Sequence, residues 1–150
     1  MRIVVASDHA AWEMKDALAA WLREEGHEVA DLGTNGPESV DYPDYGYRLA
    51  EHIAAGRAER GIALCGSGIG IAIAVNRHPA LRCAQVAEPV SAALARQHND
   101  ANAIALGARL IGLDMAKACV TAFLTGEFEG GRHCGRVDKL GAPPFEGEPA

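Results

Sequence analysis

The stretch "GIALCGSGIGIAIAVNRHP", residues 61–79, combines the signals of a strand, a tight turn and a helix. Its first residues are small or apolar, which is typical of a buried strand, and the glycines of "CGSGIG" are typical of a turn. The segment "IGIAIAVNRHP" that follows predicts a helix of small residues, which Pro79 ends. One strand–turn–helix unit is therefore predicted at the centre of the chain.

The same alternation continues on both sides of this unit. Further strands are predicted over residues 2–6, 27–33, 81–86 and 102–107, and the segments after them, 10–26, 43–59, 89–100 and 112–128, predict helices. Strands that alternate with helices form parallel sheets with right-handed crossovers. The sequence thus predicts an α/β fold, Rossmann-like and doubly wound, with a five-stranded parallel sheet and helices on both faces. We expect one domain over residues 1–150, with a C-terminal tail from about residue 138.

Composition and charge exclude several classes of protein. The 150 residues are 49% hydrophobic, which is enough for one buried core. A formal net charge of −6 argues against nucleic acid as a main partner, because phosphate-backbone binding needs a basic face. No apolar span is long enough to cross a bilayer, so we expect no membrane partner and a cytoplasmic location. The four cysteines form no paired motif, and no His, Asp or Glu set has metal-ligand spacing, so no metal is predicted.

The glycine-rich turn matches none of the common phosphate or nucleophile motifs. The dinucleotide fingerprint needs glycine where Ile71 stands, the P-loop ending is absent, and a nucleophile elbow needs glycine where Cys65 stands. What remains is a strand-to-helix turn whose free N–H groups can hold an anion or a developing oxyanion, or else a plain tight turn. Cys65 lies beside these N–H groups, where a thiolate is favoured, and Ser67 adds a hydroxyl. By contrast, Cys83 and Cys119 fit the pattern of small buried hydrophobes.

Further polar residues follow predicted strands or end a predicted helix. Asp8 and His9 follow the first strand, where Asp8 can cap the next helix and His9 can donate to an anion or shuttle a proton. His98 and Asn99 end the fourth helix, where a histidine often only complements the helix dipole. Arg109 follows the fifth strand and has the ordinary alternative of a surface arginine. Each is a candidate site residue with a structural alternative.

Positive charge is concentrated in "GRHCGRVDK", residues 131–139. Arg132 and Arg136 stand four residues apart, so a helix there would place both guanidinium groups on one face. With His133 beside them they form a candidate phosphate clamp, and the alternative is a solvated basic patch.

Taken together and in this order, the motifs "SDHA", "DYPDY", "LCGSGIGIAIAVNR", "RQHNDAN", "LGARLIG" and "EFEGGRHCGRV" resemble the ribose-5-phosphate isomerase B family. The likeness runs from residue 1 to about residue 137. It implies a Rossmann-like domain, a small-molecule sugar phosphate as substrate, and a homodimer or dimer of dimers with active sites between subunits. It also implies that no cofactor and no metal is used. The implied reaction interconverts D-ribose 5-phosphate and D-ribulose 5-phosphate through a cis-enediolate.

The resemblance also implies roles for individual residues. Cys65 matches the base that moves a proton between C2 and C1, and His98 matches the residue that opens the sugar ring, with Asp8 assisting. The Ser67 hydroxyl and the loop amides would stabilise the enediolate. The implied substrate-binding residues are His9, Tyr42, Gly66, Gly68, Gly70, Asn99, Arg109, Arg132, His133 and Arg136.

Several alternatives remain open at this point. Part of the family carries a glutamate where this chain has Ile71, so the pair Cys65 and Ile71 is typical of cysteine-type members. Related isomerases act on galactose 6-phosphate, allose 6-phosphate or erythrulose 4-phosphate. A different class is a non-catalytic, anion-binding Rossmann-like module, in which Cys65 would be dispensable. A thiol redox sensor is disfavoured because no resolving cysteine is adjacent in sequence.

Overall fold

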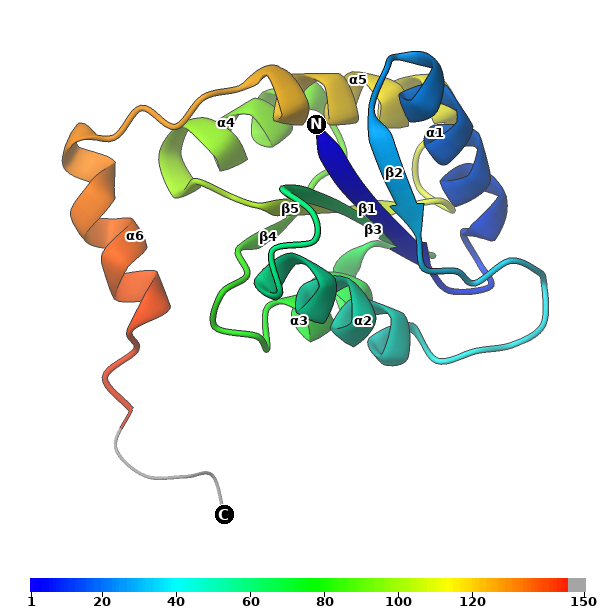
Figure 1. Ribbon diagram of the computed structural model, residues 1–150, viewed down its shortest axis with the longest axis horizontal. Helices are drawn as coiled ribbons and strands as arrows, with labels where there is room; N and C mark the ends of the chain where they lie inside the picture. The colour runs from blue at the N-terminus through cyan, green and yellow to red at the C-terminus, as the bar shows by residue number, and fades with distance from the viewer. Residues whose placement is uncertain (146–150) are drawn as a thin grey trace.

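A computed structural model describes residues 1–145, which form a five-stranded sheet in the order β2-β1-β3-β5-β4 with all neighbouring strands parallel (Figure 1). The elements in chain order are β1 (Arg2–Ser7), α1 (Trp12–Glu24), β2 (Glu28–Asp31), α2 (Tyr42–Ala54), β3 (Arg60–Cys65), α3 (Ile69–Val75), β4 (Cys83–Gln85), α4 (Pro89–Asn99), β5 (Ala103–Gly107), α5 (Leu113–Thr125), the 3-10 turn η1 (Gly131–His133) and α6 (Cys134–Gly141). The expected five strand–helix units are all present.

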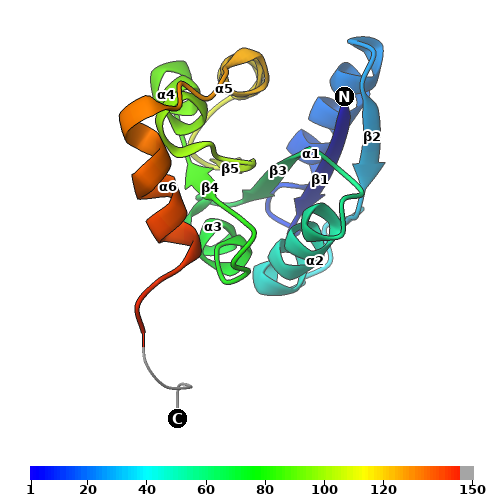
Figure 2. The same ribbon diagram turned by 60° about the vertical axis from the view of Figure 1, so that its left-hand side comes forward.

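Helices cover both faces of the sheet (Figure 2). Successive strand residues point to opposite faces, so Ile62 and Leu64 pack with α1, α4 and α5, whereas Ala63 and Cys65 pack with α2 and α3. The central strands are buried on both sides, which explains why they read as continuous apolar runs rather than as an alternating pattern. The predicted Rossmann-like, doubly wound class is confirmed.

Helix α3 ends earlier than the sequence predicted. The pattern favoured a helix up to Pro79, but the helix ends at Val75 and Asn76 lies in its C-cap. The Asn76 side chain donates to the Cys83 carbonyl at 2.8 Å and accepts from the Cys83 N–H at 2.7 Å. These two bonds tie the loop to the start of β4, because they offer the backbone an alternative to another helical turn.

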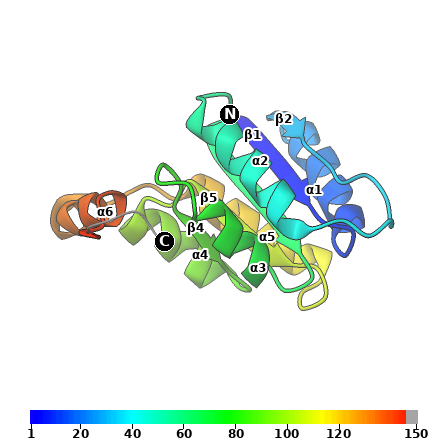
Figure 3. The same ribbon diagram turned by 90° about the horizontal axis from the view of Figure 1, so that it is seen from below.

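The C-terminal segment turns away from the sheet. After α5 the chain passes along α4, where the Glu129 N–H donates to the Gln97 carbonyl at 3.0 Å, and then forms η1 and α6. Helix α6 stands apart from the body in two views (Figures 1 and 3). It continues to Gly141, beyond the point at which the sequence predicted the tail to begin. Residues 146–150 of that tail lie outside the described residues.

The sheet has a topological switch point between β1 and β3. Strand β2 lies on one side of β1 and β3 on the other, and the helices that follow β1 and β3, which are α1 and α3, pack on opposite faces. The loops that follow β1 and β3 therefore diverge, which opens a crevice at the carboxyl ends of these strands where ligands of open α/β sheets bind. Among residues 1–145, no helix has both the length and the apolar composition needed to span a membrane.

Candidate active site

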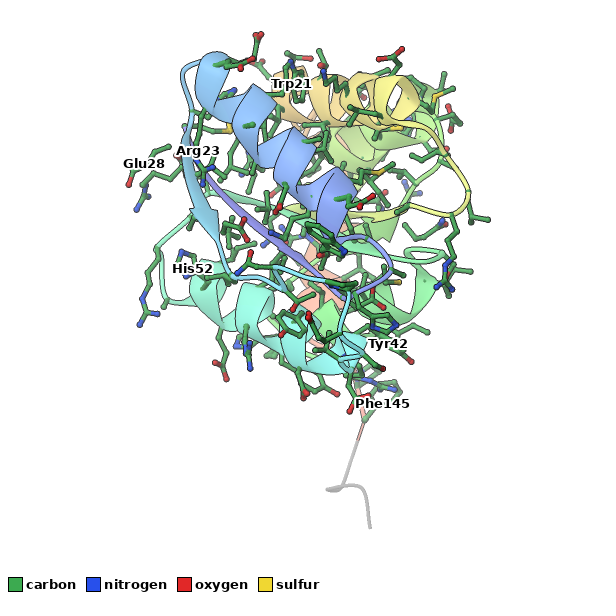
Figure 4. The ribbon with its side chains drawn as sticks, turned by 90° about the vertical axis from the view of Figure 1, so that its right-hand side faces the viewer. Trp21, Arg23, Glu28, Tyr42, His52 and Phe145 are labelled. Atoms are coloured by element: carbon green, nitrogen blue, oxygen red, sulfur yellow. The ribbon has the colours of Figure 1, made fainter. Side chains whose placement is uncertain are left out.

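A cavity of about 590 Å³ lies at the carboxyl ends of β1, β3 and β5. It is lined by residues from the loops after these strands and from the first turns of α2 and α3: Asp8, Tyr42, Cys65, Gly66, Ser67, Ile69, Gly70, Ile73, Arg109 and Leu110. The structure therefore brings together many of the residues that the sequence predicted for the site. Figure 4 labels Tyr42 at the start of α2, at the edge of the sheet toward which β1 runs.

Two glycines of the loop are required by close packing. Gly68 has φ +78°, and a Cβ there would lie 2.8 Å from the backbone carbon of Leu106. A side chain at this position would therefore suffer both backbone strain and a clash. A Cβ at Gly70 would lie 2.6 Å from the ring of Tyr42. The loop consequently lies flat against β5 on one side and accepts the tyrosine ring on the other.

Cys65 forms part of the cavity wall at the end of β3 and is only 4% exposed. The Gly68 N–H donates to its Sγ at 3.2 Å, so the turn folds back over the sulfur atom. The Ser67 Oγ accepts from the Ile69 N–H at 3.2 Å. The N–H groups of Ser67 and Gly70 have no acceptor among residues 1–145, which leaves them available to an anionic atom in the cavity.

Asp8 lies beside Cys65, because β1 pairs with β3 and the Asp8 N–H donates to the Leu64 carbonyl at 3.2 Å, and His9 follows at the margin of the cavity. Asp8 is buried and lines the cavity, and its Oδ1 accepts from the Ala10 N–H at 3.0 Å. The alternative interpretation of Asp8 as a helix cap is wrong, because α1 begins one turn later with Ala11 as its N-cap and without a side-chain cap. The His9 ring lies against the loop before α2, where the Val40 N–H donates to its Nδ1 at 3.1 Å. His9 does not belong to the lining of the cavity.

A second group of predicted residues gathers beside the end of α4. The rings of His98 and His133 stack with their centroids 4.4 Å apart, and His133 Nε2 lies 3.6 Å from Glu129 Oε2. Arg132 and Arg136 lie in η1 and α6, so the helical conformation assumed for the phosphate clamp is present, and both side chains are exposed. Burial lowers the pKa of His133, and the charges of Arg132 and His98 lower it further.

The two groups lie at opposite ends of the strands. Helix α4 runs back from the carboxyl edge to the amino edge, so His98 and Asn99 at its end lie near the start of β5, while Cys65 lies at the carboxyl edge. Asn99 lines a different cavity, of about 360 Å³, together with Arg82, Cys83 and Leu140. Figure 1 shows the same separation, with α6 at the left and the ends of β1 and β2 at the right. Within one chain the structure does not bring the two groups together.

The apolar part of the cavity and the acidic member of the second group, Glu129, were not predicted from the sequence. Ile69 and Ile73 line the cavity although each is 54% exposed, and Leu110 lines it from the loop after β5. The four-residue spacing of the two isoleucines on α3 was a usable signal for a shared face. Glu129 stands four residues before His133, which was a usable signal for that pair, but its closeness to His98 had no sequence signal.

Comparisons with known proteins agree with this geometry. The family model described as ribose/galactose isomerase matches residues 3–140. The chain is 43% identical to ribose-5-phosphate isomerase B of Escherichia coli (strain K12), over 94% of this chain and 95% of that protein. It is 41% identical to D-erythrulose-4-phosphate isomerase of Pectobacterium atrosepticum, over 94% of this chain and 93% of that protein.

A solved structure is also closely similar. Ribose-5-phosphate isomerase B from Clostridium thermocellum superposes with a TM-score of 0.93 at 48% identity, which covers 94% of this chain and 95% of that chain. The resemblance found in the sequence motifs is confirmed by both kinds of comparison. The chain belongs to the ribose/galactose isomerase family and is an isomerase.

Proposed function

We propose that the protein interconverts D-ribose 5-phosphate and D-ribulose 5-phosphate in the cavity around Cys65, with no cofactor or metal in the reaction. The observation that carries this proposal is the thiol of Cys65 in the cavity wall, with the free N–H groups of Ser67 and Gly70 near it and Asp8 beside it at the end of the neighbouring strand. An aldose–ketose isomerisation needs a base for a carbon-bound proton and donors for the oxygen on which charge develops. The cavity offers both.

The proposed steps use these groups in turn. His98 takes the proton from the anomeric hydroxyl, the bond between C1 and the ring oxygen breaks, and the ring oxygen takes up a proton to become a hydroxyl, with Asp8 assisting. The Cys65 thiolate then removes the proton from C2, and the electron pair of the broken C–H bond moves to give the cis-enediolate. The Ser67 hydroxyl and the loop amides stabilise the negative oxygen, an effect of about 3 kcal/mol for one well-placed donor in other enzymes. The proton of the C2 hydroxyl passes to the C1 oxygen, the Cys65 thiol returns its proton at C1, and the C2 carbonyl of the ketose forms.

The separation of the two groups supports a homodimer, alone or within a dimer of dimers, with active sites between subunits. One chain carries Cys65 and Asp8 at one edge and His98 with the two arginines at the other, so a second copy is needed to complete each site. The exposed apolar side chains of Ile69, Ile73 and Leu110 border the Cys65 cavity and suit contact with a second copy. In such a dimer, His98, Asn99, Arg132, His133 and Arg136 face the partner's Cys65 cavity.

The choice of sugar is tested by a panel of substrates. We expect the highest kcat/KM with D-ribose 5-phosphate and much lower values with galactose 6-phosphate, allose 6-phosphate and D-erythrulose 4-phosphate, each assayed by appearance of the isomerised sugar. Efficient turnover of another sugar alone would keep the mechanism but refute the pentose as substrate. No turnover of any of them would favour the non-catalytic, anion-binding module.

Arg136→Ala is expected to raise KM for the sugar phosphate about 10- to 100-fold with little change in kcat. A charge-assisted hydrogen bond to phosphate is worth about 1.5–3 kcal/mol, and it is made equally in the ground and transition states. The matched control is Arg57→Ala, which removes another exposed arginine in the loop after α2. Initial-rate kinetics over a range of substrate concentrations separate the two parameters. An unchanged KM in the Arg136 variant would refute the phosphate clamp.

A further inference from the structure

Three potential metal ligands meet beside the end of α4. His98 comes from α4, Glu129 from the segment after α5, and His133 from η1. One ligand atom from each lies within 4.8 Å of the other two. Glu129 and His133 stand four positions apart, whereas His98 stands about 30 positions before them, so the approach of His98 to this pair could not be predicted from ligand spacing.

His133 is the most constrained member of this cluster. Its side chain is 8% exposed, and its Nε2 is buried without a hydrogen-bond partner among the described residues. The same atom points toward Glu129 Oε2, 3.6 Å away. Leaving a buried polar atom unpaired is costly, so His133 Nε2 is available to a further ligand at this cluster.

We propose that His98, Glu129 and His133 bind a divalent transition-metal cation of the zinc class, and that the bound cation inhibits the isomerase. Two imidazoles and one carboxylate form a ligand set that zinc accepts with a fourth position left open to water. Hard cations such as magnesium or calcium prefer an all-oxygen shell and are poorly served by a single carboxylate.

The cluster needs only side-chain rotations to reach a coordinating geometry. Ligand bonds of about 2.0–2.1 Å place ligand atoms of a tetrahedral zinc site about 3.3 Å apart, closer than the present limit of 4.8 Å. The Glu129 side chain is 51% exposed and free to move inward. The two imidazole rings are nearly parallel, with 14° between their planes, so the half-buried His98 ring must turn for both lone pairs to meet at one point.

The charges around the cluster make the carboxylate necessary for metal binding. Arg132 and Arg136 lie beside His133 in η1 and α6 and repel a cation. Glu129 is the one carboxylate of the cluster and offsets this repulsion, so it is the residue on which metal affinity depends most.

Inhibition follows from the identity of one ligand. His98 is the group proposed to open the sugar ring, and a bound cation occupies the lone pair that would accept the proton. This second part of the inference rests on the proposed function, whereas metal binding does not. The two parts are therefore measured by separate readouts.

Binding is measured on the metal-free full-length protein with cobalt(II) as a spectroscopic probe and zinc as its competitor. We expect one cobalt ion per chain, with visible bands typical of nitrogen and oxygen ligands, and displacement by zinc. Glu129→Gln should weaken binding at least 10-fold, while the matched control Glu127→Gln, another exposed acid two residues away, should bind like the parent protein. Equal binding by the two variants, or an intense thiolate-to-metal band from a cysteine site, would overturn the proposal.

Inhibition is measured as the zinc concentration that halves turnover of D-ribose 5-phosphate, relative to the metal-free rate of each variant. This concentration should rise at least 10-fold in Glu129→Gln and stay unchanged in Glu127→Gln. Cobalt binding with no loss of turnover would refute the inhibitory role and leave the site itself standing. A protein that turns over no sugar phosphate would refute the proposed function, while the cobalt spectra would still decide whether the metal site exists.

Discussion

Replacing Cys65 by alanine is expected to lower kcat for D-ribose 5-phosphate about 1,000-fold or more while leaving the affinity for the substrate nearly unchanged. A well-placed general base contributes about 10²–10⁴ to the rate. The thiol takes part in proton transfer in the transition state. Its loss therefore raises the activation free energy of isomerisation without removing a contact to the bound substrate in its ground state. Turnover is measured by conversion of aldose to ketose, and affinity by calorimetric titration of the inactive variant.

The matched control removes another buried thiol. Cys119 lies in the core on α5, outside both groups of site residues, and is fully buried like the catalytic candidate. Cys119→Ala should lower stability by about 1 kcal/mol through a small cavity, with kcat unchanged. Cys65→Ser tests the chemistry itself, because a hydroxyl keeps the shape but is a far weaker acid. A Cys65→Ala variant with kcat within tenfold of the parent would show that the thiol is not the base.

Most of the fold could be predicted because each strand–helix unit carries its own local signals. The apolar run and glycine turn at residues 61–79 specify a buried strand and a following helix without reference to the rest of the chain. The point at which α3 ends could not be predicted, because it depends on the bonds between Asn76 and the distant Cys83 backbone. The bounds of helix α6 were not predicted either, because the segment "EGGRHCGR" contains glycines that disfavour helix formation.

The site was predictable to a similar degree. The residues after strands β1, β3 and β5 converge because parallel strands end at one edge, so Asp8, Cys65 and Arg109 were placed together correctly. The residues at the end of α4 lie near the amino ends of the strands, because a helix between parallel strands runs back from their carboxyl ends to their amino ends. The sequence motifs assign the residues around Cys65 and those around His98 to one function. They do not show that the two groups lie far apart within a single folded chain. The position of Glu129 and His133 beside His98 depends on long-range packing, for which the sequence contains no periodic signal, although Glu129 and His133 themselves are only four residues apart.

Mixing two inactive variants is expected to restore activity, because each proposed site combines residues from two chains. Cys65→Ala and His98→Asn, each inactive alone, are unfolded together in denaturant and refolded at equal concentrations. Random pairing makes half of the dimers mixed, and in a symmetric dimer each mixed pair has one intact site and one site lacking both groups. The mixture should therefore recover about a quarter of the parent activity, measured as turnover of D-ribose 5-phosphate.

The double variant provides the control that separates the two models. A chain carrying both substitutions, refolded with an equal amount of the parent chain, yields mixed dimers in which each site lacks either Cys65 or His98. The parent chains should then lose about half of their activity, whereas chains with complete sites of their own would lose none. Native mass spectrometry verifies that mixed dimers form. If mixed dimers form and the two single variants regain no activity, each chain must complete its own site. The separation between Cys65 and His98 would then have to be bridged by a movement of α6 and the end of α4 within one subunit.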